Sequence, residues 1–182
     1  MKQIIFYACC IVFAISCNNS AEKSTTADST KMADIKMEEL VYPYTLDKPY
    51  KDWQAGSQQN AVMVLKMLKA WETKNFTECA SYFGDTLDIS TDYYHQVLPK
   101  DSILGMLESS WANYASVNVK MQDWESVISK DKKDEWVTVW YKQSWVDKKG
   151  KADSMSVVND AKIVNGKITV FDEKVQHYPK GK

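Results

Sequence analysis

The chain has 182 residues, which suits one domain with appendages, and 45% of them are hydrophobic, which is enough for a buried core. The formal net charge is −1, so the composition carries no electrostatic footprint for nucleic-acid binding. Three of the four cysteines lie at or before Cys17, which leaves Cys79 alone in the predicted domain and excludes a disulfide within it. We interpret Cys79 as a small buried apolar residue rather than a catalytic thiol.

The N-terminus has the pattern of a lipoprotein signal peptide. Residues 4–15 are almost uniformly apolar, too few for a membrane span but typical of a signal-peptide core. Residues 14–17 (AISC) then resemble the bacterial motif in which a small residue precedes a cysteine that takes a diacylglyceryl group. We expect a signal peptide at 1–16 and a lipid anchor on Cys17 in the outer membrane, with the domain facing the periplasm and surface exposure left open. The alternative is an ordinary signal peptide with an incidental cysteine.

Two further segments precede the predicted domain. Residues 17–34 are small and polar without a periodic apolar pattern, which predicts a disordered tether. Residues 35–56 contain Pro43 and Pro49 beside aromatic residues, which disfavours a helix and predicts an extended arm that packs on the domain. The side chains expected to contact the domain are Leu40, Val41, Tyr42, Tyr44, Leu46 and Tyr50.

The domain, residues 57–182, is expected to begin with two helices. Ser57 suits the N-cap position, and the strongly apolar stretch up to Trp71 predicts a helix that needs a wide partner surface. Lys74 and Asn75 break this helix. Thr77 is expected to cap a second helix, which Gly84 ends.

A short strand at 86–90, an irregular piece at 91–99 and a third helix follow. Asp101 is the expected N-cap of this helix. Its buried face is expected to hold Ile103, Leu104, Met106, Leu107, Trp111 and Tyr114.

The remaining sequence predicts a meander of four strands, at about 117–128, 135–146, 152–164 and 167–178. The strongest hairpin signal is Asn165-Gly166, because both residues tolerate the positive φ of a type I′ turn.

This order of elements resembles the nuclear transport factor 2-like superfamily, in particular its SnoaL-like branch. The residues that carry the resemblance are VLKMLKAWETKNFTECASYFGDTLDI (64–89) and VVNDAKIVNGKITVFDEKVQHY (157–178). The resemblance implies an α+β fold: a cone-shaped, curved antiparallel sheet wrapped around a long N-terminal helix, with two further helices. It implies little about function, because such domains include isomerases, hydrolases and pure binding modules. The N-terminal pattern also looks like that of single-domain lipoproteins of Bacteroidetes-type bacteria.

Strand register gives a hypothesis for a pocket inside the cone. A two-residue turn at Asn165-Gly166 pairs Val164 with Lys167 and, counted back along both strands, Asn159 with Asp172. The strand face that holds Asn159 and Asp172 is the more apolar of the two, so we assign it to the interior.

The neighbouring strand extends this hypothesis. A four-residue loop at 147–150 would place Thr138 beside Asn159, with a tryptophan on either side. The predicted pocket lining is therefore Trp136, Thr138, Trp140, Asn159 and Asp172.

Two interpretations of these polar residues remain open. A desolvated Asp172 could act as a general base. Family isomerases of the ketosteroid type pair such a base with a tyrosine that stabilises the oxyanion. Tyr93 or Tyr94 could offer that hydroxyl and His95 a second titrating group, although no motif fixes these partners. Alternatively, Asn159 and Asp172 form a cross-strand pair that satisfies its own hydrogen bonds.

No sequence motif indicates a metal or a cofactor. The two histidines are far apart, and the six glycines form no phosphate-binding loop. We therefore expect no metal site and no cofactor.

The leading functional hypothesis is a membrane-anchored binding or accessory module for a small hydrophobic ligand. The alternative is a small-molecule isomerase or hydrolase with a carboxylate base. Self-association as a homodimer is a third expectation, through an outer sheet face that would expose Val137, Val139, Tyr141 and Trp145.

Overall fold

The computed structural model describes residues 42–178 of the chain. The helices of this part are α1 (Gln58–Glu72), α2 (Phe76–Ser81) and α3 (Lys100–Ser110). Its strands are β1 (Gln54–Ala55), β2 (Phe83–Ser90), β3 (His95–Pro99), β4 (Tyr114–Ile128), β5 (Glu135–Asp147), β6 (Ala152–Val164) and β7 (Lys167–His177). None of the helices in residues 42–178 is long and apolar enough to cross a membrane. The predicted signal peptide, Cys17 and the tether lie outside the described residues.

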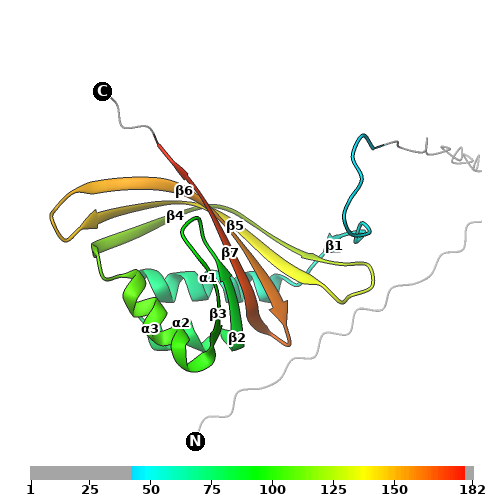
Figure 1. Ribbon diagram of the computed structural model, residues 1–182, viewed down its shortest axis with the longest axis horizontal. Coiled ribbons are helices and arrows are strands. Elements are labelled where there is room, and N and C mark those ends of the chain that lie inside the picture. The colour runs from blue at the N-terminus through cyan, green and yellow to red at the C-terminus, as the bar shows by residue number, and fades with distance from the viewer. Residues whose placement is uncertain (1–41, 179–182) are drawn as a thin grey trace, which may run out of the picture. The chain divides into compact units, whose positions relative to one another are not determined.

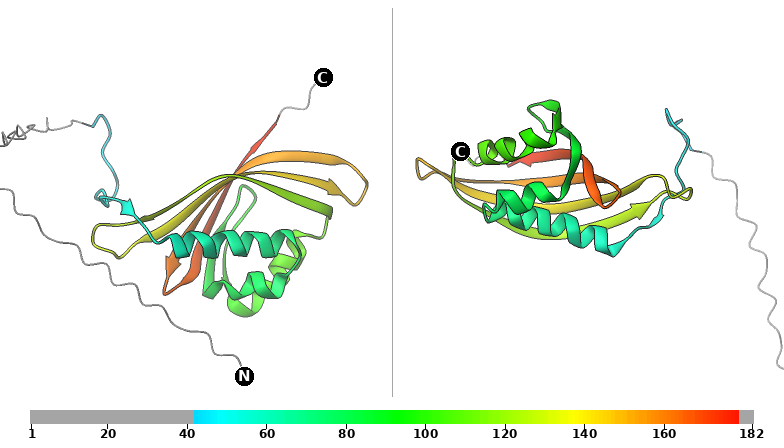
Figure 2. Two further views of the ribbon diagram at one scale, coloured as in Figure 1. Left: turned by 180° about the vertical axis from the view of Figure 1, so that it is seen from behind. Right: turned by 90° about the horizontal axis from the view of Figure 1, so that it is seen from below.

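The seven strands form one curved sheet in the order β1-β4-β5-β6-β7-β2-β3. Neighbouring strands are antiparallel except for β2 and β7, which run parallel. The three helices lie against the concave face of the sheet (Figures 1 and 2). The predicted α+β architecture is therefore confirmed, and the expectation of a purely antiparallel sheet is wrong at the β2–β7 junction.

The core lies between α1 and the inward faces of the central strands. Apolar residues repeat at helical spacing along α1, which places Ala61, Val64 and Met67 together on its buried side. Val139 of β5 and Val157 of β6 belong to the same cluster and are at most 1% exposed. The long apolar helix thus has the wide partner surface that its sequence requires.

The helix ends differ from the sequence prediction in their capping. Ser57 stands at the N-cap position of α1, but its hydroxyl makes no capping bond; its backbone N–H donates to Glu135 Oε1 over 3.3 Å. Asn75, not Thr77, caps α2, because its side chain accepts from the backbone N–H of Glu78. Gly84 does not end α2 but lies buried inside β2.

The third helix and the segment before it also differ. Asp101 lies in the first turn of α3, while Pro99 holds the N-cap position. Residues 95–99, expected to be irregular, form β3 and pair with β2 as a hairpin. Leu104, expected on the buried face of α3, is 38% exposed.

Two small irregularities change the register of the meander. The turn at Asn165-Gly166 pairs Val164 with Lys167, as predicted, but the register then shifts after Ile163 and Ile168. Asn159 therefore lies opposite Glu173 and not opposite Asp172. Since side chains alternate between faces, this one-residue shift turns Asp172 outward and Glu173 inward.

The loop between β5 and β6 causes the second change. Val146 pairs with Ala152, so the connection has five residues and not four. The carboxylate of Asp147 accepts from the backbone N–H groups of Lys149 and Lys151, each over 2.8 Å, and Gly150 supplies a positive φ of 82°. Thr138 consequently faces Asp160 rather than Asn159.

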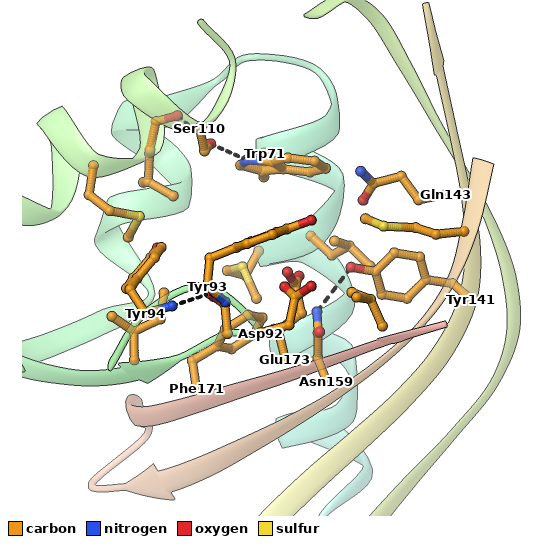
Figure 3. A pocket seen from close by; sticks show the side chains of 18 of the residues that line it. Trp71, Asp92, Tyr93, Tyr94, Ser110, Tyr141, Gln143, Asn159, Phe171 and Glu173 are labelled. Carbon is orange, nitrogen blue, oxygen red and sulfur yellow. Dashed lines mark hydrogen bonds between the residues drawn. The ribbon is translucent and has the colours of Figure 1, made fainter. Parts of the chain in front are cut away.

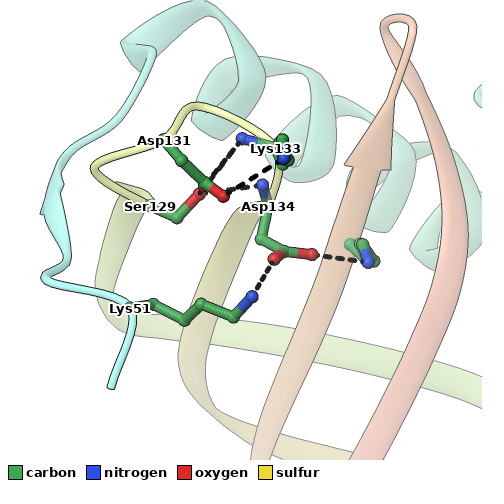
Figure 4. A network of polar contacts seen from close by, with 6 residues as sticks. Lys51, Ser129, Asp131, Lys133 and Asp134 are labelled. Carbon is green, nitrogen blue, oxygen red and sulfur yellow. Dashed lines mark hydrogen bonds and ion pairs between the residues drawn. The ribbon is translucent and has the colours of Figure 1, made fainter. Parts of the chain in front are cut away.

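A polar network holds the segment before α1 to the sheet (Figure 4). Lys51 Nζ lies 2.9 Å from Asp134, which also pairs with Lys162 over 2.8 Å. These two lysines, Lys162 first, lower the pKa of Asp134 to about 2. Next along the chain, β1 pairs with β4, and the Gly56 N–H donates to the Ser126 carbonyl over 2.8 Å.

Within the described part of the predicted arm, the residues next to α1 dock in this way. Leu46 and Tyr50 are 64% and 65% exposed, so the expectation that they pack on the domain is wrong. The expectation for Tyr42 and Tyr44 stays a prediction, and Leu40 and Val41 lie outside the described residues.

Candidate functional site

A pocket of about 270 Å³ lies between the concave face of the sheet and the helices α1 and α3 (Figure 3). Strands β5, β6 and β7 form its floor, and the turn between β2 and β3, residues 91–94, borders it. Elements from both ends of the domain contribute to the lining, which the parallel pairing of β2 with β7 brings together.

The walls of the pocket are mostly apolar and aromatic. Met67, Phe83, Met155 and Phe171 line it and are at most 9% exposed, and the rings of Phe83 and Phe171 meet edge to face. The other side is aromatic: Trp71, Tyr114 and Trp145 line the pocket, and the rings of Tyr114 and Trp145 lie 5.9 Å apart.

Hydrogen bonds hold this aromatic side in place. Trp71 Nε1 donates to Ser110 Oγ over 2.9 Å, which links α1 to the end of α3. Trp111, whose ring lies 5.7 Å from that of Trp71, donates its Nε1 hydrogen to the Trp71 carbonyl over 3.0 Å. The indole of Trp71 is thus fixed in orientation before any ligand arrives.

Glu173 is the central polar side chain of the pocket. It lies on the inward face of β7, beside Asp92 from the β2–β3 turn (Figure 3). Burial, and secondly the charge of Asp92, raise the pKa of the Glu173 carboxyl to about 7. Glu173 has no hydrogen bond or ion pair with any other residue in 42–178, so nothing in this part of the chain neutralises its charge.

Asn159 and Tyr141 form a buried pair beside Glu173. Asn159 Nδ2 donates to Tyr141 Oη over 3.0 Å, and both residues are 1% exposed. Burial, and to a lesser extent the charge of Glu173, raise the pKa of the Tyr141 hydroxyl above its usual value. Asn159 Oδ1 is buried without a hydrogen-bond partner among the described residues.

The turn at the edge of the pocket has its own local bonds. Thr91 Oγ1 accepts from the backbone N–H groups of Tyr93 and Tyr94, over 3.1 and 3.2 Å. This arrangement directs Asp92 toward the pocket, where its carboxylate lies 3.9 Å from His177 Nε2. Tyr93 and Tyr94 border the same space.

Most of the residues predicted to line the pocket lie on the other face of the sheet. Asp172 pairs with Lys174 over 2.7 Å, and Thr138 donates to Asp160 over 2.6 Å; neither lines the pocket. Trp136 and Trp140 share this outer face, because the inward side chains of β5 are their odd-numbered neighbours. Asn159 alone of the predicted lining set borders the pocket.

Of the other predicted catalytic candidates, His95 lies away from the pocket and Tyr93 borders it. His95 lies in β3, is exposed, and is bonded to Asp88 over 2.7 Å, away from the pocket. Tyr93 borders the pocket, although it is 78% exposed. The cross-strand pair of Asn159 with Asp172 does not form.

The outer-face patch proposed for dimerisation is also corrected. Val137, Val139 and Tyr141 are at most 1% exposed and face the core. Self-association stays a prediction, but these residues cannot mediate it.

Sequence reasoning missed Glu173, the residue on which the site centres. Its signal was present, because Glu173 is the next residue after Asp172 and lies in a segment of regular alternation. Only the register shift near Thr169 decides which of the two carboxylates faces inward.

The described residues contain no group of three or more histidine, cysteine or acidic side chains that could hold a metal ion. Cys79 is buried, and burial raises the pKa of its thiol to about 12, so the thiol has the character of an inert core residue.

No protein-family model matches the sequence, and no curated protein matches it. Solved structures do. An NTF2-like protein of unknown function from Exiguobacterium is similar with a TM-score of 0.53 at 12% identity, over 63% of this chain and 98% of that chain. An LEH-like epoxide hydrolase from M. tuberculosis is similar with a TM-score of 0.52 at 14% identity, over 66% and 84%.

A third similar structure comes from Catenulispora acidiphila. It has a ketosteroid isomerase-like fold, was solved in complex with trimethylamine, and is similar with a TM-score of 0.50 at 15% identity, over 62% of this chain and 83% of that chain. This chain has a nuclear transport factor 2-like fold. At these identities the likeness extends to the fold alone.

Proposed function

We propose that this domain binds a small, largely apolar molecule in the pocket on the concave face of its sheet. The observation that carries the proposal is a cavity of about 270 Å³ with apolar walls and a few convergent polar groups, the usual composition of a small-molecule site. Its volume lies just below the range of pockets for drug-sized ligands, which favours a small compound. The similar structure with trimethylamine lends support, since it holds a small organic molecule.

A pocket-filling substitution tests this proposal. Met106 of α3 lines the pocket, whereas Leu104, two residues earlier, is 38% exposed and does not. We expect Met106→Trp to weaken the binding of 3-phenylpropanol to the full-length chain at least tenfold in isothermal titration calorimetry. Leu104→Trp, the matched control, leaves binding unchanged. Equal affinities of Met106→Trp and the unmodified chain would contradict a ligand role for this pocket.

A second candidate function is proton transfer, with Glu173 as the general base. The observation that favours it is the pKa of about 7, which suits a base at neutral pH. A bound carbonyl compound could give an α-proton to Glu173 while the Tyr141 hydroxyl donates to the developing oxyanion. The measurement is deuterium exchange at the α-carbon of small ketones in D₂O, which Glu173→Gln should abolish; absence of exchange in the unmodified chain argues against an enzyme.

We also propose that the domain is anchored through a lipid on Cys17 in the outer membrane and faces the periplasm. The support is the apolar run at 4–15 followed by the AISC sequence at 14–17. Several acyl chains anchor a protein firmly, at about 0.8 kcal/mol per buried methylene. Within this proposal, the ligand would be a compound present in the cell envelope.

A further inference from the structure

The fixed charges that line the pocket are negative. Its lining includes the carboxylates of Asp92 and Glu173 and no lysine, and the sequence contains no arginine. Of the side chains that line the pocket, the one that can carry positive charge is His177, whose Nε2 lies 3.9 Å from Asp92. An anionic ligand would therefore meet two like charges and no fixed positive charge.

Glu173 lacks a partner in a place where partners are needed. A carboxylate removed from water is costly unless a cation or a hydrogen-bond donor replaces the lost hydration. None of the described residues supplies either to Glu173. A proton or a ligand that carries positive charge would supply the missing partner.

The other groups that line the pocket are suited to a ligand that carries positive charge. Asn159 Oδ1 is a buried acceptor without a partner in residues 42–178, and it lies on the strand paired with that of Glu173. The aromatic residues Trp71, Tyr114 and Trp145 also line the pocket, and electron-rich ring faces attract cations. Carboxylates, a free amide oxygen and aromatic rings around an apolar space are together complementary to an organic cation.

We propose that the pocket binds a small organic ammonium ion, with its nitrogen beside Glu173 and Asp92 and its apolar body against Phe83 and Met155. This inference rests on the proposed ligand-binding function and specifies its ligand class. N–H groups of the ammonium ion donate to the Glu173 carboxylate and to Asn159 Oδ1. Its carbon chain fills the space between the apolar wall and the Trp71 ring.

The pH dependence follows from the groups that face Glu173. A proton and the ammonium ion compete for the Glu173 carboxylate, whose pKa is raised to about 7, so affinity for the cation increases as pH rises through about 7. Asp92 and His177, whose carboxylate and Nε2 lie 3.9 Å apart, line the same space. Tyr94, Tyr114 and Tyr141 also face this carboxylate; their hydroxyl pKa values are raised, so they stay neutral over this range.

The test compares three compounds with one carbon frame: 3-phenylpropylammonium, 3-phenylpropanol and 3-phenylpropanoate. Each is titrated into the full-length chain at pH 8 by calorimetry. We expect the ammonium ion to bind at least tenfold more tightly than the alcohol, and the carboxylate to bind more weakly than both. In Glu173→Gln, which keeps the size of the side chain, the preference for the ammonium ion over the alcohol falls at least tenfold.

Asp172→Asn is the matched control. It removes the neighbouring carboxylate on the same strand, which lies on the outer face, so the preference for the ammonium ion should persist. If the alcohol binds as tightly as the ammonium ion, or if Glu173→Gln leaves the preference intact, the ammonium inference is overturned and the ligand-binding function stands. If none of the three compounds binds, both fail. Circular dichroism and the thermal midpoint establish that each variant is folded.

Discussion

Glu173 lies among apolar and aromatic side chains, and its ionisation opposes folding. The pKa of the Glu173 carboxyl is raised from 4.5 to about 7. At pH values between these two, the unfolded chain has lost a proton that the native state keeps. The native state therefore loses stability as pH rises from about 4.5 to about 7. At about 1.4 kcal/mol per pKa unit, the loss is on the order of 3 kcal/mol.

This penalty gives a prediction for Glu173→Gln in the absence of ligand. The variant should match the unmodified chain in free energy of unfolding at pH 4.5 and exceed it by up to about 3 kcal/mol at pH 9. Urea denaturation at both values measures the difference. Asp172→Asn provides the comparison, because its carboxylate has the partner Lys174; a stabilisation at pH 9 of equal size in both variants would disprove the special role of Glu173.

At the scale of elements, the short strand β1 depends on a glycine. A methyl group added to Gly56 would lie 2.5 Å from Ser126 Oγ and 2.9 Å from the Val127 backbone of β4. Gly56→Ala should therefore reduce the free energy of unfolding by about 1–3 kcal/mol. Gly105→Ala is the matched control, since a methyl group there meets nothing within 4 Å and replaces a glycine inside α3; we expect a gain of about 0.5–1 kcal/mol. Chemical denaturation measures both, and equal effects would contradict the close approach at Gly56.

Elements were also the scale at which sequence reasoning was most reliable. Apolar periodicity and the Asn165-Gly166 turn identified α1 and the four long strands, because these patterns are local and extend over many residues. The β2–β3 hairpin was missed, since Asp92, Tyr93 and Tyr94 at its turn carry no specific hairpin signal. The faces of β5 and β7 were inverted because a single extra residue, in the 147–151 loop and near Thr169, changes the register of a whole strand. The bulge near Thr169 is set by hydrogen bonds between β6 and β7, so it has no signature in the sequence of one strand.

At the scale of the whole molecule, the anchoring proposal concerns where the pocket works. We expect the full-length chain expressed in a bacterium to fractionate with membranes and to incorporate an alkyne-labelled palmitate. Cys17→Ser should lose the label and leave the membrane fraction, because one cysteine carries the acyl chains. Cys10→Ser, within the apolar run, should keep both properties. Labelling that persists in Cys17→Ser would show that this cysteine is not the anchor.

The parallel junction between β2 and β7 has a consequence for how the molecule forms. Phe83 of β2 pairs with Ile168 of β7, so the strand that carries Glu173 and its parallel neighbour are separated by most of the domain's sequence. During synthesis, β2 and β3 emerge well before β7 and have no sheet to join until the last strand arrives. Closure of this long loop costs chain entropy before its contacts repay it, which slows folding. A chain that ends before β7 leaves the facing edges of β6 and β2 without their partner strand and open to association with other chains.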